Sequence, residues 1–238
     1  MALSFSDRSS TYTTTGATSY ATGTSFTPAA NSLMICFVFA SSTDTTESQP
    51  TSVSGNGVTY TQLTPTYFQS AVTSGSVWVG IVGSSPTSDV VTASGWGTAR
   101  TGISMAVLEV TGADVSGTAA NAVQTLNTAG PTNNTTLTVT MSGPVTAGNL
   151  CCGMFDHTAN EVIAAGTGCT LGSTGNYASP NRGSGSVYDT TVYTSPVATW
   201  TTSAGCRGFG IEIKIAAAGG GTVLPRRDSP AVNMLLRR

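Results

Sequence analysis

Charge is scarce in this chain. Charged side chains make up 8% of its 238 residues, with a single lysine, Lys214, and a single histidine, His157. A disordered chain is usually rich in charge and poor in apolar residues, whereas 39% of this chain is apolar. Leu, Glu and Lys, which favour helical bundles, are also few. The composition therefore argues against a disordered chain and against a helical bundle.

Long apolar runs are missing as well. The longest, Leu33–Ala40, has eight residues, whereas a membrane-spanning helix needs about twenty. Met1–Ser10 has neither a basic start nor a long apolar stretch, so it does not resemble a secretory signal peptide. We expect a chain that is made in the cytoplasm of its host cell and that does not cross a membrane.

The few charges are unevenly placed. Residues 1–217 carry five basic and ten acidic side chains, a net charge of −5. Residues 218–238 carry four arginines and one aspartate, a net charge of +3. A negatively charged body repels nucleic acid, so we expect no direct nucleic-acid binding by residues 1–217. The basic C-terminal segment is the part that could attract an acidic partner.

The sequence carries no metal or disulfide signature. The cysteines are odd in number and include no Cys-x-x-Cys pair and no Cys/His spacing that suits zinc. Without an export signal, a disulfide framework is not expected. We expect no metal and no cofactor, and we interpret the five thiols as small buried apolar groups: Cys36, Cys151, Cys152, Cys169 and Cys206.

Hydroxyl groups and glycine take the place of charge. Ser and Thr together number 71, and Gly numbers 28. Runs rich in Val, Ile, Thr and aromatic residues alternate with Gly/Ser/Asn/Pro clusters, and the dominant hydrophobic period is two residues. This pattern predicts an all-β fold, an antiparallel β-sandwich with jelly-roll-like connections over residues 1–217. We expect strands near residues 2–6, 11–15, 31–41, 57–63, 75–83, 88–94, 102–111, 134–142, 148–157, 186–194 and 205–216.

Two halves of the body echo each other. An apolar strand opens at Leu33 after an Asn-Ser pair, and another opens at Leu150 directly after an Asn. Each half later contains an apolar strand interrupted by a glutamate, Glu109 in the first and Glu212 in the second. Two similar halves suit the double Greek key of a jelly roll. Coincidence among strands of biased composition is the alternative.

Two Gly-rich segments are predicted to be long connections. Residues 124–135 contain Gly130-Pro131, and residues 170–185 contain four glycines and Pro180. Long loops on a rigid sandwich are where binding usually occurs.

The C-terminal segment, residues 218–238, differs from the body. Three consecutive glycines form a flexible joint, and residues 222–225 are expected to be extended. Asp228 or Ser229 can cap a short helix with Pro230 in its first turn. Because so short a helix is marginal alone, we predict that the tail docks on a neighbouring subunit, the alternative being a disordered end. The expected anchoring contacts are Val223, Leu224, Arg226, Arg227, Val232, Leu235, Leu236, Arg237 and Arg238.

Few residues suggest chemistry. Asp156, His157 and Glu161 form the one titratable cluster that contains histidine, but neighbours in a strand point to opposite faces, which spoils a metal or acid–base site. Glu109 and Glu212 could hydrolyse a glycoside if they faced each other, or could each lie on the polar face of a sheet. We expect no catalytic residue.

Aromatic and acidic loop residues offer weaker candidates. Trp96 lies between glycines and is a possible surface contact, for a glycan or for a protein interface, whereas Trp78 is expected in the core. Trp200, Tyr67 and Tyr177 could join a sugar-stacking surface. Asp44 and Glu47 could contribute to a calcium site, although the EF-hand spacing is absent.

Several segments together resemble a known group of proteins. They are Asn31–Leu33, Gly55–Tyr60, the strand with Trp78, Glu109, Asn149-Leu150 and Gly210–Lys214. In rhythm and composition they are similar to the Ser/Thr/Gly-rich β-sandwich modules of tailed bacteriophage virions, over about residues 25–216. This resemblance implies a capsid decoration (cement) protein, a head fibre, or a tail or adsorption component. It carries over no catalytic residue, and the basic tail is not part of the shared pattern.

We therefore expect a non-enzymatic virion protein, either a capsid decoration protein or a tail-associated component. It would assemble with copies of itself and with other virion proteins, such as major capsid or tail proteins. The alternative is a carbohydrate-binding or adhesion module of a tail or head fibre, which would bind a host surface glycan. A glycosidase that uses Glu109 and Glu212 is the third hypothesis.

Overall fold

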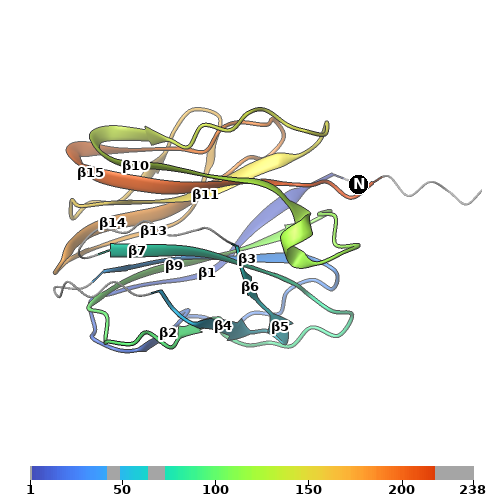
Figure 1. The fold of residues 1–238 in the computed structure, drawn as a ribbon, viewed down its shortest axis with the longest axis horizontal. Helices are drawn as coiled ribbons and strands as arrows, with labels where there is room; N and C mark the ends of the chain where they lie inside the picture. Colours follow the sequence, from blue (N-terminus) through green and yellow to red (C-terminus); the bar gives the residue numbers. More distant parts are fainter. Residues whose placement is uncertain (1, 42–48, 64–72, 218–238) are drawn as a thin grey trace, which may run out of the picture.

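The computed structural model describes residues 2–41, 49–63 and 73–217 (Figure 1). Strands account for 59% of the structure and helix for 2%, and the sheets are antiparallel. The predicted all-β fold and antiparallel β-sandwich are therefore confirmed. The predicted tail helix lies outside the described residues. Within the described ranges, no helix has the length and apolar character needed to span a bilayer.

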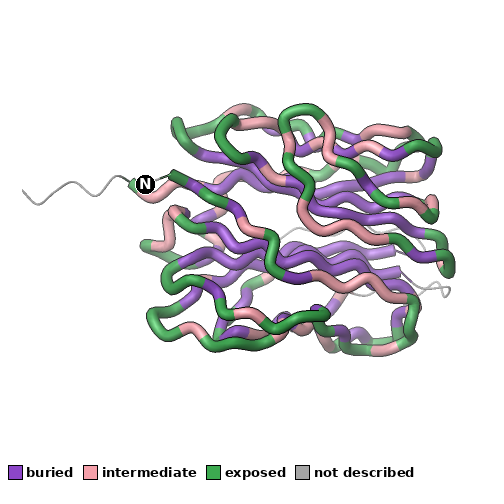
Figure 2. The backbone as a smooth tube through the Cα atoms, turned by 180° about the vertical axis from the view of Figure 1, so that it is seen from behind, coloured by how far each residue is buried: buried purple, intermediate pink, exposed green. Residues whose placement is uncertain are grey.

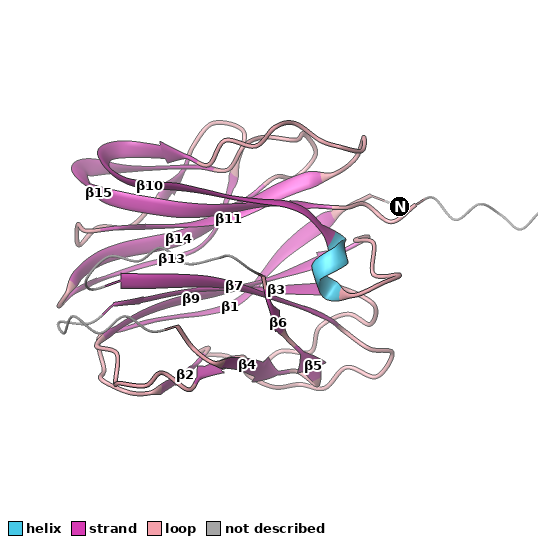
Figure 3. Cartoon of the chain, in the orientation of Figure 1, coloured by secondary structure: helices cyan, strands magenta, loops and turns pink. Residues whose placement is uncertain are grey.

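The strands form three stacked layers (Figures 1 and 3). The middle sheet has the order β1-β9-β3-β7-β6, and a larger sheet on one side of it has the order β10-β15-β11-β14-β13, with β12 paired to β15. A small sheet, β2-β8-β4-β5, covers the other side. The middle sheet consists of β1 (Ser4–Thr13), β9 (Gly102–Thr111), β3 (Leu33–Ser41), β7 (Thr73–Ile81) and β6 (Thr61–Gln62).

The other two layers and their connections complete the fold. The larger sheet consists of β10 (Val123–Thr138), β15 (Val197–Ile213), β11 (Leu150–His157), β14 (Asn181–Tyr188), β13 (Thr170–Ala178) and β12 (Ala164–Ala165). The small sheet consists of β2 (Ser19–Ala21), β8 (Thr92–Ser94), β4 (Ser52–Gly55) and β5 (Val58–Thr59). A short 3-10 helix, η1 (Ala119–Ala122), leads into β10.

The middle sheet is buried on both faces (Figure 2). Because side chains alternate along a strand, β3 sends two sets of apolar residues in opposite directions. Leu33 and every second residue to Phe39 pack against the larger sheet, whereas Met34 and its alternates to Ala40 pack against the small sheet. This explains why the longest apolar run in the sequence is a strand.

The outer face of the larger sheet has a core of its own. The far ends of β10 and β15 pair beyond the body of the sheet and bring Leu137, Ala198 and Trp200 over Cys151 and Phe155. Each of the three apolar cores therefore lies on one face of a large sheet, and another segment of the chain covers that face.

The two large sheets have the same strand order and the same register. With the two-residue strand β12 left out, the five strands of each sheet, counted along the chain, follow the spatial order first, fifth, second, fourth, third. Leu33 lies opposite Val110, as Leu150 lies opposite Ile213. Likewise Met34 and Cys151 are the residues opposite Glu109 and Glu212, respectively.

The predicted similarity between the two halves of the chain is therefore confirmed, but the arrangement of the two halves in space differs from the expected one. Each half of the chain builds a sheet of its own, and the two sheets stack face to face. The strands do not follow the Greek-key order, in which the fourth strand returns beside the first of three consecutive neighbours. The jelly-roll-like connections are thus replaced by two repeats of one five-stranded unit.

Both predicted long connections are strands instead. Residues 124–135 belong to β10, where the ladder with β15 shifts register between Ala129 and Thr132. Gly130 has φ +88° at this bulge, and proline is tolerated there because β10 is an edge strand. Residues 170–185 form β13 and most of β14, and that ladder also has a bulge, between Leu171 and Thr174.

Gly75 tests the packing between the two large sheets. A Cβ at this residue of β7 would lie 2.7 Å from ring atoms of Phe39 and Phe209, which stack with their centroids 5.1 Å apart. We expect Gly75→Ala to lower the free energy of unfolding by about 1–3 kcal/mol through overpacking. The matched change Gly83→Ala, where a Cβ meets nothing within 4 Å, should change it by less than about 0.5 kcal/mol. Urea denaturation of both variants measures this, and equal effects would contradict the packing.

Candidate functional site

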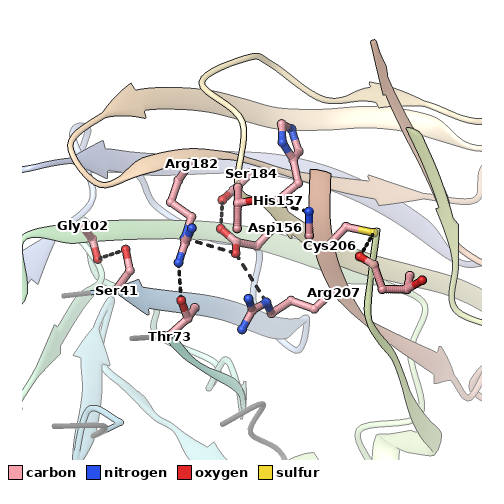
Figure 4. Close-up of polar contacts among 12 residues, drawn as sticks. Ser41, Thr73, Gly102, Asp156, His157, Arg182, Ser184, Cys206 and Arg207 are labelled. Atoms are coloured by element: carbon pink, nitrogen blue, oxygen red, sulfur yellow. Dashed lines mark hydrogen bonds and ion pairs between the residues drawn. The ribbon is translucent and has the colours of Figure 1, made fainter. Parts of the chain in front are cut away.

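The largest group of buried charges closes one end of the core between the two large sheets (Figure 4). Asp156 on β11, Arg182 on β14 and Arg207 on β15 are 1%, 5% and 5% exposed. Each occupies the strand position that faces the middle sheet, since Met154 and Phe209, two residues away on β11 and β15, belong to the inter-sheet core. We call these three residues the inter-sheet charge cluster.

One carboxylate lies between two guanidinium groups. Asp156 Oδ2 is 3.6 Å from Arg182 Nε and 3.8 Å from Arg207 Nε. Asp156 Oδ1 accepts a hydrogen bond from Ser184 Oγ at 2.9 Å. The ion-pair distances exceed those of a hydrogen bond, so the attraction is mainly Coulombic, and burial strengthens it.

The same end of the core holds the two large sheets together by hydrogen bonds. Arg182 Nη2 donates to Thr73 Oγ1 on β7 at 2.5 Å. The hydroxyl of Tyr177 on β13 lies 3.2 Å from Ser41 Oγ on β3. Thr73 and Arg182 also occupy equivalent positions in the two repeats, because β7 and β14 pair with β3 and β11 in the same register. These contacts make the cluster a polar tie between the repeats.

Asp156, His157 and Glu161 do not form one site. Asp156 faces the middle sheet, whereas His157 faces the opposite way and stacks on Trp200, with centroids 4.7 Å apart. Burial lowers the pKa of His157. Glu161 accepts the backbone N–H of Thr202 and the side chain and N–H of Thr201, and these bonds lower its pKa to about 2. The expected separation of neighbouring strand residues is confirmed.

Glu109 and Glu212 cannot act as a catalytic pair. On both strands the residues beside the glutamate, Leu108 and Ile213 among them, belong to the core between the large sheets. The two carboxylates therefore lie on opposite outer faces of that sandwich. Each therefore points away from the core between the large sheets, as the alternative expected, but both are buried, 1% and 0% exposed. Hydrogen bonds compensate for the burial of each carboxylate: Glu109 accepts from the backbone N–H of Ala29 and from Arg8, and Glu212 accepts from the backbone N–H of Val145 and from side chains.

The two glutamates hold equivalent turns. Glu109 Oε1 accepts the backbone N–H of Ala29 at 2.7 Å, and its other oxygen binds Arg8 Nε. Ala29 belongs to the turn that opens β3, in which Ser32 N donates to Ala29 O.

The second copy of this arrangement is more fully bonded. Glu212 Oε1 accepts the N–H of Val145 at 3.0 Å and Asn149 Nδ2 at 2.7 Å, and its Oε2 accepts Thr125 Oγ1 at 3.2 Å. The turn that opens β11 is closed by Asn149 N donating to Thr146 O. Each glutamate thus anchors the entry to the central strand of its repeat.

A further buried carboxylate lies beside Glu212. Asp189 Oδ2 accepts the backbone N–H groups of Cys151 at 2.8 Å and Thr194 at 2.9 Å. Burial raises the pKa of Asp189 to about 6, against the opposing effect of these two N–H groups. Burial likewise raises the pKa of the neighbouring Cys151 thiol to about 12.

The aromatic candidates lie inside the protein. Trp96 is 3% exposed and packs edge-on against Tyr20, with ring centroids 5.7 Å apart, so its expected role as a surface contact is wrong. The small sheet and its loops enclose Trp96, which the flanking glycines did not indicate. Tyr177 and Trp200 are buried as well, and Trp78 lies in the core as predicted.

The thiols largely match their interpretation. Among the five cysteines, all free, four are buried and Cys169 is partly exposed. In residues 2–41, 49–63 and 73–217, no three His, Cys, Asp or Glu side chains are grouped so as to hold a metal ion. Asp44, Glu47, Tyr67 and the anchoring residues of the tail lie outside the described residues.

The inter-sheet charge cluster was not anticipated from the sequence. Arg182 lies in a Gly-rich segment that the sequence predicts to be a loop. Arg207 follows a cysteine in a predicted strand, and the sequence does not indicate which strand pairs with it. A charged residue in a strand whose other residues are small or apolar is the signal that could have indicated a buried charge. That signal does not identify the oppositely charged residue that pairs with it.

Comparisons of the chain with protein-family models, with curated proteins and with solved structures returned no match.

Asp156 tests the structural role of the inter-sheet charge cluster. Asp156→Asn leaves Arg182 and Arg207 buried without this carboxylate, so we expect the free energy of unfolding to fall by about 3–5 kcal/mol. Asp114→Asn is the matched control, because the Asp114 carboxylate bonds only locally to Ser116 on the surface, and it should cost less than about 1 kcal/mol. Guanidinium denaturation measures both, and similar losses would contradict the role.

Asp189 predicts a pH dependence of stability. Its native pKa of about 6 exceeds the ordinary value of 3.8, so between these values the native state holds a proton that the unfolded chain has lost. The free energy of unfolding should therefore fall as pH rises through this window and level off above it. Relative to Asp189→Asn, the natural chain should lose about 1–3 kcal/mol between pH 4 and pH 7.

Urea titrations at several pH values measure this difference. Glu161→Gln is the control, because a pKa of about 2 means that the contribution of Glu161 is already constant between pH 5 and pH 7. A difference between the natural chain and Asp189→Asn that does not vary with pH would contradict the assignment.

Proposed function

We propose that this chain is a non-enzymatic structural subunit of a virion, a capsid decoration protein or a tail-associated component. It would assemble through contacts between subunits, and the C-terminal tail would make one of these contacts. The observation that carries the proposal is how the body uses its buried carboxylates. Glu109, Glu212 and Asp189 bind backbone N–H groups, and Asp156 binds two arginines. In each case the carboxyl group is bonded inside the fold.

The design of the body supports a structural role. Two copies of one five-stranded unit pack through a continuous apolar core, and buried polar contacts fasten one end of it. Such a body is stiff, because its interior is packed and its buried polar groups are tied between sheets. Copies held in a symmetric array can sum weak contacts into a stable assembly.

The tail supports assembly through its composition. Residues 218–238 combine a Gly joint, apolar residues and four arginines, with a net charge of +3, whereas the body carries −5. A basic, partly apolar segment on a flexible joint suits docking on an acidic neighbouring surface. The neighbour would be another copy of the chain or another virion protein.

The adhesion alternative receives less support. Its expected feature was an exposed ridge of Trp96, Tyr67 or Tyr177; Trp96 and Tyr177 are buried, and Tyr67 lies outside the described residues. The glycosidase hypothesis required Glu109 and Glu212 to face each other, and they lie on opposite outer faces. Neither of these corrections weakens the structural proposal, since it needs no exposed aromatic ridge and no carboxylate pair.

Removal of the distal tail tests the proposal. We expect the full chain, 24.0 kDa, to form oligomers in solution. We expect a chain that ends at residue 225 to remain folded but to form smaller species, because it lacks the arginines and the Leu235-Leu236 pair. Light scattering coupled to size-exclusion chromatography measures the masses, with Asn233→Ala in the full chain as the control. A strictly monomeric full chain, or oligomers unaffected by the truncation, would contradict the proposal.

A further inference from the structure

One combination of side chains occurs in the second repeat and not in the first. The chain has a single lysine, Lys214, which directly follows β15, and Glu212 precedes it by two residues. The register of β11 with β15 pairs Leu150 with Ile213, and its next pair along the two chains is Asn149 with Lys214. A lysine, an asparagine and a glutamate are therefore brought together where β11 begins and β15 ends.

The three side chains lie on the same face of the larger sheet. Ile213 and Ile215 pack toward the core between the two large sheets. Lys214 lies between them in the sequence, so it points to the outer face, as Glu212 does. The amide of Asn149 reaches that carboxylate, since its Nδ2 donates to Glu212 Oε1 at 2.7 Å. Asn149 and Lys214 also line the same pocket, which has a volume of about 450 Å³.

The backbone hydrogen bonds make Lys214 and Asn149 a close cross-strand pair. Lys214 N donates to Ala122 O and Lys214 O accepts from Asp114 N, both at 2.9 Å, so both backbone groups point away from β11. Asn149 N donates to Thr146 O within its own turn and therefore does not pair with β15. In an antiparallel ladder this is a non-hydrogen-bonded pair, in which the Cα atoms are about 4.5 Å apart and the side chains lie closest.

The Asn149 amide is held in place for attack at its carbonyl carbon. Its Oδ1 accepts the backbone N–H of Ile215 at 3.0 Å, and a donor at this distance stabilises negative charge that develops on the oxygen. Its Nδ2 lies beside the Glu212 carboxylate, which can transfer a proton to a departing nitrogen. Asn149 and Glu212 are 1% and 0% exposed, so water competes little for either contact.

Lys214 is not bound to another charge. Asp114 lines the same pocket, but its carboxylate accepts two hydrogen bonds from Ser116. Within the described ranges, no ion pair joins Lys214 to Asp114 or to another carboxylate. The amine is therefore available to the amide that lies opposite it.

The first repeat provides an internal comparison. There the glutamate is retained, whereas the counterparts of Asn149 and Lys214 are Ser32 and Thr111. The turn that opens the central strand forms in both repeats, so this turn requires neither an asparagine nor a lysine. The pair in the second repeat therefore suits a role beyond holding the turn.

We propose that Lys214 and Asn149 of the same chain join in an isopeptide bond, with Glu212 as the carboxylate that transfers the proton. Glu212 takes a proton from the Lys214 ammonium group, and the free amine attacks Asn149 Cγ. The bond from Nζ to Cγ forms, the bond from Cγ to Nδ2 breaks, and Glu212 returns its proton to the departing nitrogen. The ammonia that leaves takes up the second proton of the amine as ammonium. Nothing is oxidised or reduced, and no co-reactant is needed.

The bond would protect the end of the body from which the tail extends. The tail begins at residue 218, four residues after Lys214, so a pull on the tail acts first on the end of β15. With the bond in place, the load passes from Lys214 directly to Asn149 and bypasses residues 150–213. This use rests on the proposed function, in which the tail anchors the chain to a neighbour. The bond itself does not, so the two proposals can fail separately.

The intact mass of the purified full chain tests the inference. We expect a mass that is lower by one ammonia than the mass of the unlinked sequence. Lys214→Arg, which keeps the positive charge, and Glu212→Gln should both show the unlinked mass, whereas the control Asn176→Ala, at an exposed asparagine, should keep the loss. Trypsin should release a branched peptide that joins residues 101–182 to residues 208–226, because trypsin does not cut after an acylated lysine.

Three results would overturn the inference. The first is a natural chain that has the unlinked mass, a measurement that does not depend on any variant being able to fold. The second is an ammonia loss that persists in Lys214→Arg, since the lysine would then take no part in it. The third is a link between two chains, which a denaturing gel would show as a dimer band. The chain that ends at residue 225 should show the same ammonia loss whether or not it assembles, which separates this test from the test of assembly.

Single-molecule stretching between the two ends of the chain tests the load path. The bond should keep residues 150–213 out of the extension, so the natural chain should unfold to a length about 200 Å shorter than that of Lys214→Arg. Equal lengths for the two chains would show that the bond is absent and would contradict the inference.

Discussion

Apolar packing between two copies of one five-stranded sheet is the constraint on which the rest of this structure depends. The central strands β3 and β11 enter the core through Leu33 and Leu150, and their partners β9 and β15 align on them in the same register. Close contact between the sheets requires small residues at the points of nearest approach. Gly75, beside the stacked rings of Phe39 and Phe209, is such a point.

The scarce charges follow from the same constraint. Burying a charge is costly unless it is paired or hydrogen-bonded. This chain places several buried charges where they fix the start of a strand or join the two large sheets. Glu109 and Glu212 fix the turns that open the central strands. Asp156 and its two arginines close one end of the core.

The sequence allowed much of the fold to be predicted but less of the site. Alternation and turn residues were sufficient for the all-β class, and the two interrupted strands with Glu109 and Glu212 indicated the repeat. Strand positions were harder in Gly-rich segments: residues 170–185 pair as strands, with one bulge between Leu171 and Thr174 and the remaining glycines in regular register. Long-range features were inaccessible. Nothing local in the sequence places Arg182 and Arg207 beside Asp156, and the burial of Trp96 depends on a small sheet assembled from three separate segments.

We propose that this stiff, repeated β body functions as part of an ordered particle. Mass spectrometric quantification of this chain in purified virions, against the soluble fraction of the same lysate, tests that claim most directly. The account predicts that the chain is enriched in the particles at a constant ratio to the major capsid protein from one preparation to the next. Recovery of the chain only in the soluble fraction, with none in the particles, would contradict it.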